Sequence, residues 1–495
     1  MKKKDWIYFI FVAVIFAVFY YFFCEDSPVH DLFYTRNHID RRDPPWYFTC
    51  GKALANGMTP YIDFADSKGP LLWLVYALAY IISPTDYLGV YFIHCVLYIA
   101  SMLIMFMTVK LFVGKPLPAA LLTVLTIPFL FIPSIHYETK SEDLSFIFVA
   151  ISLWQTCKLL YQDGIKDKDY GLAFFLWGLC FGGTLMIKYN SSAMIGVFLV
   201  FMLVKLKKES RRFWPMFYQA VAGACVIVVP ILIYLAIKGS LWAFIDDYFI
   251  QTPQTIGNLV SGKSYFMQML GRHDFVWIMI MFLCGCGASW FWLPRWKGFP
   301  IISGAWFIAL IMLFARGYYI NICGPLMIFV PLTFWAAITR HRLPNIISAA
   351  VMVVVLVFFG YQHRKWYTKE YFGGLPEEAR RKNCAAMNEY IAGKAYKPLI
   401  LYYGCSDKGY GLASEGLPAC RYWSLQGGYT KRMGDDQQSC VELRKADFVF
   451  VKSDADSRRK RLRENGYRMV KLSPATKYLL YEKNPGWKKK AVNTP

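Results

Sequence analysis

Apolar segments long enough to cross a lipid bilayer recur along most of this chain. A transmembrane helix needs about 20 mainly apolar residues to span the hydrocarbon core. The chain of 495 residues is 56% hydrophobic and 18% aromatic, and its repeated apolar runs exclude a single soluble globule. The first run, 6–23, has no small-residue cleavage site after it, so we expect a retained helix rather than a signal peptide. The sequence predicts a polytopic membrane protein with an all-α membrane domain.

Charge in the loops sets the predicted topology. The basic loop 205–212 should be cytoplasmic, and the other short basic loops join it on that side if the segment 71–84 does not cross. That segment has fourteen residues, which is short for a span, so we predict that it lies along or dips into the outer leaflet. Eleven spans are then predicted: 6–23, 88–109, 116–133, 144–161, 170–187, 191–204, 213–237, 275–294, 299–315, 322–338 and 343–360.

The formal net charge of +22 would indicate a nucleic-acid partner in a soluble protein. Here most of the excess Lys and Arg lies in the short loops between spans, where these residues fix orientation. We therefore expect membrane lipids, and no nucleic acid, among the partners.

Residues 361–495 differ in composition from 1–360 and predict a small α/β domain on the outer side of the membrane. Residues 376–391 and 453–465 have helical periodicity, and two apolar runs, 398–403 and 447–451, are typical of buried strands. The domain holds an even number of cysteines, which permits two disulfides in any of three pairings: Cys384, Cys405, Cys420 and Cys440.

The first outer loop, 24–87, concentrates charged residues within a short stretch. Mixed charge alone is typical of a solvated loop, but the interleaved aromatic residues and prolines favour juxtamembrane helices that pack at the interface. The charged residues are Asp40, Arg41, Arg42, Asp43, Lys52, Asp63, Asp66 and Lys68, and the interleaved aromatic residues are Trp46, Tyr47, Phe48 and Tyr61.

The order of these residues resembles a known signature. The two parts of the motif are Asp43-x-x-x-Tyr47-x-x-x-Gly51-Lys52 and Gly57-x-x-Pro60-Tyr61-x-Asp63-x-x-Asp66-x-Lys68-Gly69-Pro70. Together they are similar to the first-loop signature of membrane glycosyltransferases of the GT-C superfamily. The closest branch is the bacterial one related to dolichyl-phosphate-mannose protein mannosyltransferases and the aminoarabinose transferase of lipid A. The resemblance implies an inner-membrane enzyme of cell-envelope glycan biosynthesis, with its site on the periplasmic face.

Weaker parts of the resemblance lie later in the chain. Glu142, followed by Asp143, stands where the family carries its second acidic residue. The ordinary alternative is a charged turn between two spans, which would have the same kinds of residue. Lys188 ends a span on the outer side, as in the family, and a lysine that snorkels to the interface is the ordinary alternative. Arg316 and Tyr319 belong to a segment that resembles a late outer turn of the family. The tail, including Cys420-Arg-Tyr-Trp, also resembles that of bacterial members.

The chain has no glycine-rich phosphate motif, and an enzyme outside the cytoplasm has no nucleotide sugar, so the expected donor is a sugar on a polyprenyl phosphate. Transfer to a hydroxyl of a lipid or glycan acceptor needs a general base, for which we choose Asp43. The leaving phosphate needs cations, and Lys68 is the first candidate, followed by Lys188 and Arg316. A single displacement would invert the anomeric centre of the hexose or pentose.

Glu142 is the second predicted catalytic residue, with three roles open. It could orient the acceptor, hold a lysine, or bind a divalent cation together with Asp43, in which case carboxylate ligands would suit magnesium or manganese. The remaining site candidates are Asp63, Asp66, Asp143, Tyr61 and Tyr319.

Other classes of function are weighed against this one. A transporter or flippase of lipid-linked saccharides would place ionisable residues near mid-membrane and use repeated, broken helices, whereas these charges lie in outer loops. A polysaccharide polymerase or ligase uses similar donors but usually has a large late outer loop, and 238–274 is only moderate. A phosphoethanolamine-type transferase would need a larger soluble domain with zinc ligands. The sequence favours a glycosyltransferase.

Overall fold

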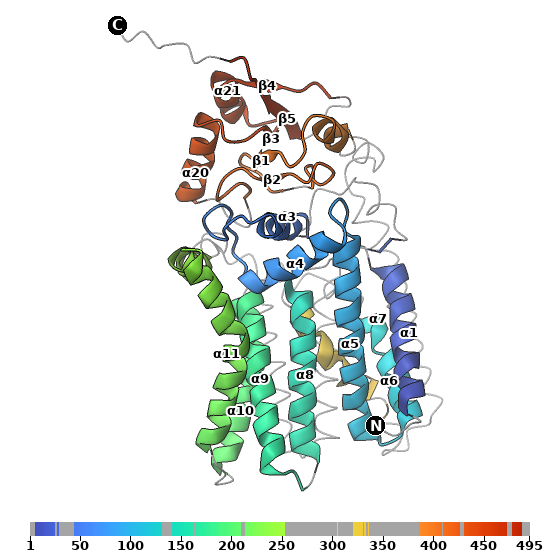
Figure 1. The fold of residues 1–495 in the computed structure, drawn as a ribbon. Helices are drawn as coiled ribbons and strands as arrows, with labels where there is room; N and C mark the ends of the chain where they lie inside the picture. Colours follow the sequence, from blue (N-terminus) through green and yellow to red (C-terminus); the bar gives the residue numbers. More distant parts are fainter. Residues whose placement is uncertain are drawn as a thin grey trace, which may run out of the picture. The chain divides into compact units, whose positions relative to one another are not determined.

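The chain forms two compact units in a computed structural model (Figure 1). The first unit comprises 1–25, 94–231 and 262–371, and the second comprises 26–93, 232–261 and 372–495. The boundary predicted between 360 and 361 lies outside the described residues. The structure describes residues 5–24, 27–28, 44–130, 141–162, 164–208, 213–252, 304, 320–329, 331–332, 335, 386–407, 409–425, 430–472 and 478–487.

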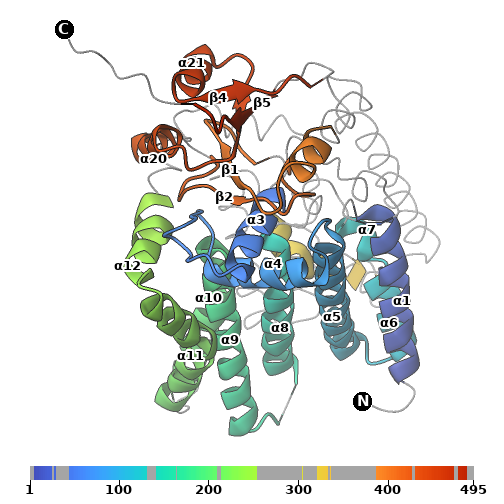
Figure 2. The ribbon, with the colours of Figure 1, turned by 45° about the horizontal axis from the view of Figure 1, so that its top comes forward.

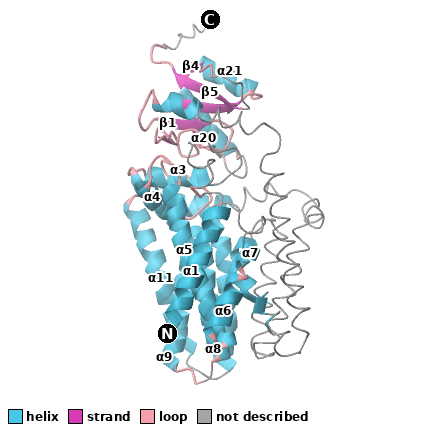
Figure 3. Cartoon of the chain, turned by 90° about the vertical axis from the view of Figure 1, so that its right-hand side faces the viewer, coloured by secondary structure: helices cyan, strands magenta, loops and turns pink. Residues whose placement is uncertain are grey.

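Long apolar helices run side by side in the first unit (Figure 3). Among the described residues, α1, α5, α8, α9 and α11 are long and apolar enough to cross a membrane, which confirms a multi-pass membrane protein. The predicted spans 6–23, 88–109, 144–161, 170–187, 191–204 and 213–237 correspond to α1 (Asp5–Phe23), α5 (Leu88–Val113), α8 (Ser141–Tyr161), α9 (Asp167–Ile187), α10 (Ser192–Lys208) and α11 (Phe213–Ile237).

The helices α1 and α5 are antiparallel. Lys110 near the end of α5 pairs with Asp5 at the start of α1, with 2.6 Å between Nζ and Oδ2. Phe16, further along α1, stacks on Tyr98 of α5, with 5.9 Å between the ring centroids. Because antiparallel spans enter and leave on the same side, the chain between them makes no net crossing. This agrees with the prediction that 71–84 does not span the membrane.

One predicted span, 116–133, is wrong as a continuous helix. It divides into α6 (Pro116–Val124) and α7 (Ile127–Leu130). At Thr126 the backbone amide donates to the carbonyl of Thr123 at 3.0 Å, a tightened turn, and Pro128 has no N–H with which to continue the helical ladder.

The later predicted spans are only partly described. Parts of 322–338 and all of 275–294 and 343–360 lie outside the described residues, as does 299–315 except for residue 304. The described part of 322–338 begins as a 3₁₀-helix, η3 (Ile320–Ile328), which contains Pro325 and packs on α8.

Glycines bring α9 and α11 into close contact. A Cβ added to Gly178 of α9 would lie 1.8 Å from the carbonyl oxygen of Ala220 in α11. A Cβ on Gly223 of α11 would lie 1.9 Å from the carbonyl oxygen of Phe175. Lipid tails are as apolar as the helix surfaces, so no hydrophobic force drives helices together in a bilayer. Small residues that let helix backbones approach closely are therefore a common basis of helix association there.

We therefore expect Gly178→Ala to destabilise the protein by about 1–3 kcal/mol, because the added methyl group must push two backbones apart. The measurement is thermal unfolding of the purified protein in detergent. Gly171→Ala, in the same helix, is the matched control, since its Cβ would meet nothing within 4 Å. Equal unfolding temperatures for the two variants would contradict this account of the contact.

Two short helices from the loop after the first span pack together in the second unit: α3 (Pro44–Ala55) and α4 (Pro70–Ile82). The 13 residues of α4 extend about 20 Å, less than the ~30 Å of a hydrocarbon core. A Cβ on Gly51 of α3 would lie 2.4 Å from the backbone carbonyl carbon of Tyr76 in α4. The glycine in the first-loop motif therefore has a packing reason: no side chain fits where the two helices cross.

The tail contains a five-stranded mixed sheet (Figure 2), and its strand order is β2-β1-β3-β5-β4. The strand β1 is parallel to β2 and β3, whereas β5 is antiparallel to β3 and β4. The strands β1 and β3 are largely buried, as expected for continuous apolar runs in a covered sheet. The elements are β1 (Leu399–Tyr402), β2 (Leu417–Pro418), α20 (Lys431–Glu442), β3 (Phe448–Lys452), α21 (Asp456–Glu464), β4 (Tyr467–Met469) and β5 (Tyr478–Lys483).

The predicted α/β tail is therefore confirmed in its central elements. The runs 398–403 and 447–451 form β1 and β3, and 453–465 contains α21. Of the predicted helix 376–391, the described part is helical from residue 386. The elements β2, α20, β4 and β5 were not predicted, because their apolar runs are short or interrupted by charge.

The cysteines of the tail are not joined by disulfides among the described residues. Cys405, Cys420 and Cys440 carry reduced thiols, and Cys384 lies outside the described residues. The thiols of Cys420 and Cys440 are hydrogen-bonded neighbours, and Cys440 Sγ also donates to the carbonyl of Ala419 at 3.7 Å. The contact with the Cys440 thiol, together with burial, raises the pKa of the Cys420 thiol.

Candidate functional site

Residues 60–69, which we name the Lys68 loop, connect α3 to α4 in a tightly held conformation. Tyr61 has a positive φ of 64°, uncommon for a residue with a side chain, and its amide donates to the carbonyl of Phe64 at 2.7 Å. The hydroxyl of Tyr61 donates to the backbone carbonyl of Lys68 at 2.8 Å. Its ring is fully buried and lies 4.7 Å from the ring of Trp73. Burial raises the pKa of Tyr61 well above its ordinary value, so the phenol stays neutral and serves as a donor.

The loop presents a buried lysine beside a buried aspartate. Lys68 is 8% exposed and Asp66 is 7% exposed. The Lys68 ammonium donates to the Ser67 hydroxyl at 3.1 Å and lies 5.6 Å from the ring centroid of Tyr47 in α3. The Asp66 carboxylate accepts a hydrogen bond from the Ser67 hydroxyl at 3.2 Å. A cation in such a partly desolvated place interacts strongly with an anion, because little water screens the charges.

Asp63, another candidate, has a local structural role. One of its carboxylate oxygens accepts a hydrogen bond from the backbone amide of Thr59 at 2.6 Å. The side chain therefore closes the turn that leads from α3 into the Lys68 loop, as aspartates often do in turns.

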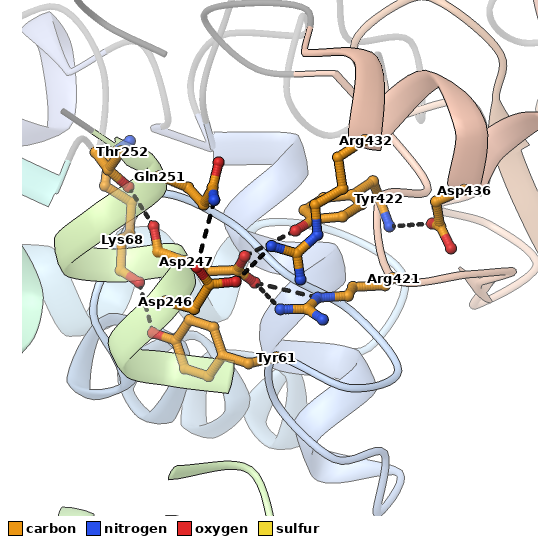
Figure 4. A network of polar contacts seen from close by, with 10 residues as sticks. All are labelled: Tyr61, Lys68, Asp246, Asp247, Gln251, Thr252, Arg421, Tyr422, Arg432 and Asp436. Atoms are coloured by element: carbon orange, nitrogen blue, oxygen red, sulfur yellow. Dashed lines mark hydrogen bonds and ion pairs between the residues drawn. The ribbon is translucent and has the colours of Figure 1, made fainter. Parts of the chain in front are cut away.

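An ionic network connects residues 245–251 to the tail within the second unit (Figure 4). It involves α12 (Leu241–Phe244) and the π-helix η2 (Ile245–Gln251). Two nitrogens of Arg421 donate to the same carboxylate oxygen of Asp247 in η2, with Nη2 at 2.8 Å and Nε at 3.2 Å from Oδ2. The hydroxyl of Tyr422 donates to its other oxygen at 2.7 Å. Asp246 pairs with Arg432 near the start of α20.

These two aspartates are in opposite electrostatic situations. Burial raises the pKa of Asp247 from its ordinary value, although Arg421 and Tyr422 act against the rise. The hydrogen bond from Arg432 lowers the pKa of Asp246. Burial beside Asp247 also raises the pKa of the Tyr422 phenol. Asp247 is thus a buried carboxylate that depends on its donors in order to remain charged.

A second polar cluster joins α3 and α4 to the tail. Thr49 of α3 donates to Asp407 at 2.9 Å, and Lys397 donates to the Asn56 side chain at 2.7 Å. Lys52, also in α3, is 1% exposed, and burial lowers its pKa to about 8 despite the attraction of Asp407 and Glu415. Its charge is therefore present at neutral pH and is lost as the pH rises above 8.

In the first unit, acidic and basic candidates meet at the ends of two helices. Glu142 and Asp143 are in the first turn of α8, and Lys188 caps the end of α9. Carboxylates at a helix N-terminus and a lysine at a helix C-terminus both complement the helix dipole. Glu142 forms an ion pair with Lys188, and Asp143 hydrogen-bonds to the Tyr98 hydroxyl of α5. The side chains of Glu142 and Asp143 are both buried.

We expect Glu142→Gln to destabilise the protein by up to about 3 kcal/mol, because it leaves the Lys188 cation in a poorly solvated place without its carboxylate. Removing both charges, with Glu142→Gln and Lys188→Met together, should recover most of the lost unfolding temperature. Lys158→Met is the matched control, because Lys158 pairs more loosely with Asp169, at 3.7 Å, between the other ends of α8 and α9.

The double variant also separates stability from function. If it unfolds like the wild type but lacks the sugar transfer predicted from the sequence, the pair acts in that reaction. An unchanged unfolding temperature for Glu142→Gln alone would contradict a buried ion pair.

Several predicted site residues lie outside the described residues: Asp43, Arg316 and Tyr319. Within the described ranges the structure brings Tyr61, Asp66 and Lys68 together in the second unit, and Glu142, Asp143 and Lys188 in the first. In the described part of the chain no group of three or more His, Cys, Asp or Glu side chains is arranged to hold a metal ion.

Sequence reasoning missed the network of η2 with the tail. A signal was present, since Asp246-Asp247 interrupts an otherwise apolar segment and Arg421 stands in the Cys420-Arg-Tyr-Trp motif. Nothing in the sequence pairs these two segments, however, because 174 residues separate Asp247 from Arg421.

Two crystal structures of ArnT from Cupriavidus metallidurans are similar to this chain. The structure described as bound to undecaprenyl phosphate matches with a TM-score of 0.63 and 14% sequence identity, over 97% of this chain and 98% of that chain. The apo structure matches with a TM-score of 0.60, at the same identity and coverage. No protein-family model and no curated protein sequence matches the chain.

The similarity agrees with the resemblance read from the first loop, because ArnT is a lipid A aminoarabinose transferase of the GT-C class. At 14% sequence identity, this structural similarity shows a shared fold. Over nearly its whole length, this chain has the fold of the GT-C transferase ArnT.

Proposed function

We propose that this protein is a glycosyltransferase that moves a sugar from a polyprenyl-phosphate donor to an acceptor hydroxyl on the extracytoplasmic face, with inversion. The observation that carries the proposal is the buried Lys68 ammonium on a loop fixed through its own backbone. Two further facts support it: the chain has the fold of ArnT, and one ArnT structure is described as bound to undecaprenyl phosphate.

The chemistry requires one proton acceptor and one place for negative charge. The acceptor oxygen attacks the anomeric carbon while the bond from that carbon to the phosphate oxygen breaks. The hydroxyl proton passes to a general base, for which we propose Asp43. The donor is a phosphodiester and the product, polyprenyl phosphate, is a monoester, so the phosphate gains one negative charge as it leaves.

Lys68 suits that developing charge. It is positioned before the reaction by the Tyr61 hydrogen bond to its carbonyl, so little reorganisation is needed when charge appears. It also lies two residues before α4, whose N-terminus carries partial positive charge. A phosphate beside Lys68 would therefore meet a lysine and a helix N-terminus together.

Glu142 had three predicted roles, and its contacts favour one of them. Its carboxylate is paired with Lys188. We propose that Glu142 holds Lys188 in a fixed orientation, which would make Glu142 a positioning residue and Lys188 the group that meets an anionic part of a substrate.

Two measurements test the function. Mass spectrometry of lipids that copurify with the protein should detect a polyprenyl phosphate or its sugar derivative. Incubation with a radiolabelled polyprenyl-phosphate sugar and membrane extract should then release polyprenyl phosphate and label an acceptor. Failure to bind any polyprenyl phosphate would refute the proposal. Binding and movement of the donor across vesicles with its sugar bond intact would instead identify a flippase.

A further inference from the structure

The network between η2 and the tail reaches the backbone of the Lys68 loop. The amide of Ala65, one residue before Asp66, donates to the carbonyl of Arg421 at 2.8 Å. The same Arg421 binds Asp247 through its guanidinium group. One residue of the tail therefore contacts the loop through its main chain and η2 through its side chain.

The loop is held from the α12–η2 side as well. Phe244, the last residue of α12, lies 5.2 Å from the ring of Tyr61, between ring centroids. Tyr61 in turn holds the carbonyl of Lys68. Figure 4 shows Tyr61 and Lys68 on one side of the Asp246 and Asp247 carboxylates, with the tail arginines on the other side.

The tail holds the turn that carries Arg421 rigidly in place. The amide of Tyr422 donates to Asp436 of α20 at 2.8 Å, and its carbonyl accepts from the Gln437 side chain at 2.7 Å. The Gln437 side chain is completely buried and also donates to the carbonyl of Tyr402 in β1 at 3.1 Å. The position of Arg421 is thus set by the core of the sheet domain.

From these contacts we propose that Arg421 and Asp247 are positioning residues for donor binding, and that the soluble tail acts through them to set the place of Lys68. This inference rests on the proposed function of Lys68 as a phosphate ligand. In this arrangement the tail domain belongs to the donor site through its hold on the Lys68 loop. Loss of the Arg421–Asp247 contact frees η2 and α12 from the tail, so that Phe244 no longer holds the Tyr61 ring and Lys68 can move away from the phosphate.

A double-mutant cycle tests the proposal, because residues that act through one another have non-additive effects. The measurement is binding of radiolabelled undecaprenyl phosphate to the full-length protein in detergent. Arg421→Gln should weaken binding about tenfold when Lys68 is present, within the range of couplings between neighbouring residues. In the Lys68→Met background the same change should weaken binding by less than about twofold, because the group that Arg421 positions is gone.

Arg421→Gln also leaves a buried carboxylate without its cation, so folding must be checked separately. The cycle is therefore repeated with Arg421→Gln and Asp247→Asn together, a pair that leaves no unpaired charge, and each variant's unfolding temperature is measured. Arg468→Gln is the matched control. It removes a guanidinium group that pairs with Glu482 at 3.1 Å elsewhere in the tail, and it should leave binding unchanged.

Additive losses in the two Lys68 backgrounds would overturn the proposal, since they would show that Arg421 supports the fold in general. Binding that depends on Lys68 and is untouched by either Arg421 variant would overturn this inference and leave the proposed function standing. Absence of undecaprenyl phosphate binding by the wild-type protein would overturn both.

Discussion

Asp43→Asn should lower the rate of sugar transfer by about 10²–10⁴-fold, the usual contribution of a positioned general base. The asparagine keeps the size of the side chain and cannot take the proton of the acceptor hydroxyl. Expression and unfolding temperature should stay close to those of the wild type. The measurement is release of polyprenyl phosphate from a radiolabelled donor under saturating donor and acceptor, so that a loss of binding is not counted as a loss of chemistry.

The control is the same substitution at an aspartate with a structural role. Asp86 accepts a hydrogen bond from the amide of Leu88 at 2.9 Å at the start of α5. Asp86→Asn retains an oxygen for that bond and should transfer sugar at the wild-type rate. Full activity of Asp43→Asn would remove Asp43 from the proposed role and would direct attention to the other carboxylates of the chain.

Lys68→Met should raise the KM for the donor by about 10- to 100-fold, which corresponds to the loss of one charge-assisted contact with the phosphate. The KM for the acceptor should change little, because the lysine is proposed to meet the leaving group. Methionine fills a similar volume, so the loop should keep its packing between α3 and α4. Steady-state kinetics with each substrate varied in turn would measure both constants.

Lys52→Met is the matched control for this variant, since Lys52 is a second buried lysine of the same unit. Its charge is attracted by Asp407 and Glu415 of the tail, so its loss should affect stability without altering the donor KM. The comparison is made at pH 7, where Lys52 still carries its charge in view of its pKa of about 8. A donor KM unchanged by Lys68→Met would count against phosphate binding at this loop.

The membrane-spanning helices were predictable because the bilayer imposes a simple rule. Every backbone polar group in the hydrocarbon core must be bonded within its own segment, so a long apolar run becomes a helix whatever its neighbours are. The runs 88–109 and 213–237 could therefore be assigned from hydropathy alone. The failure at 116–133 has the same origin, since a window of apolarity does not register the tightened turn at Thr126.

The first-loop motif indicated the importance of Lys68 and Gly51, but the geometry of the loop could not be derived from the sequence. Tyr61 adopts a positive φ and donates to the Lys68 carbonyl. This conformation depends on the aromatic side chains packed around the Tyr61 ring. Asp63 closes a turn, whereas Asp66 lies buried beside Lys68. The spacing of the two aspartates in the sequence does not specify the backbone hydrogen bonds that create this difference.

The sequence by itself determined that this protein crosses the membrane many times, carries an α/β tail and concentrates its unusual charges in the loop after the first span. These are properties of local segments, fixed by apolar length, periodicity and charge. Tertiary structure decided which distant charges meet: Asp247 with Arg421, and Glu142 with Lys188. Such pairs depend on how the chain folds back over tens to hundreds of residues, and an ionic group can pair with any opposite charge that packing brings near it.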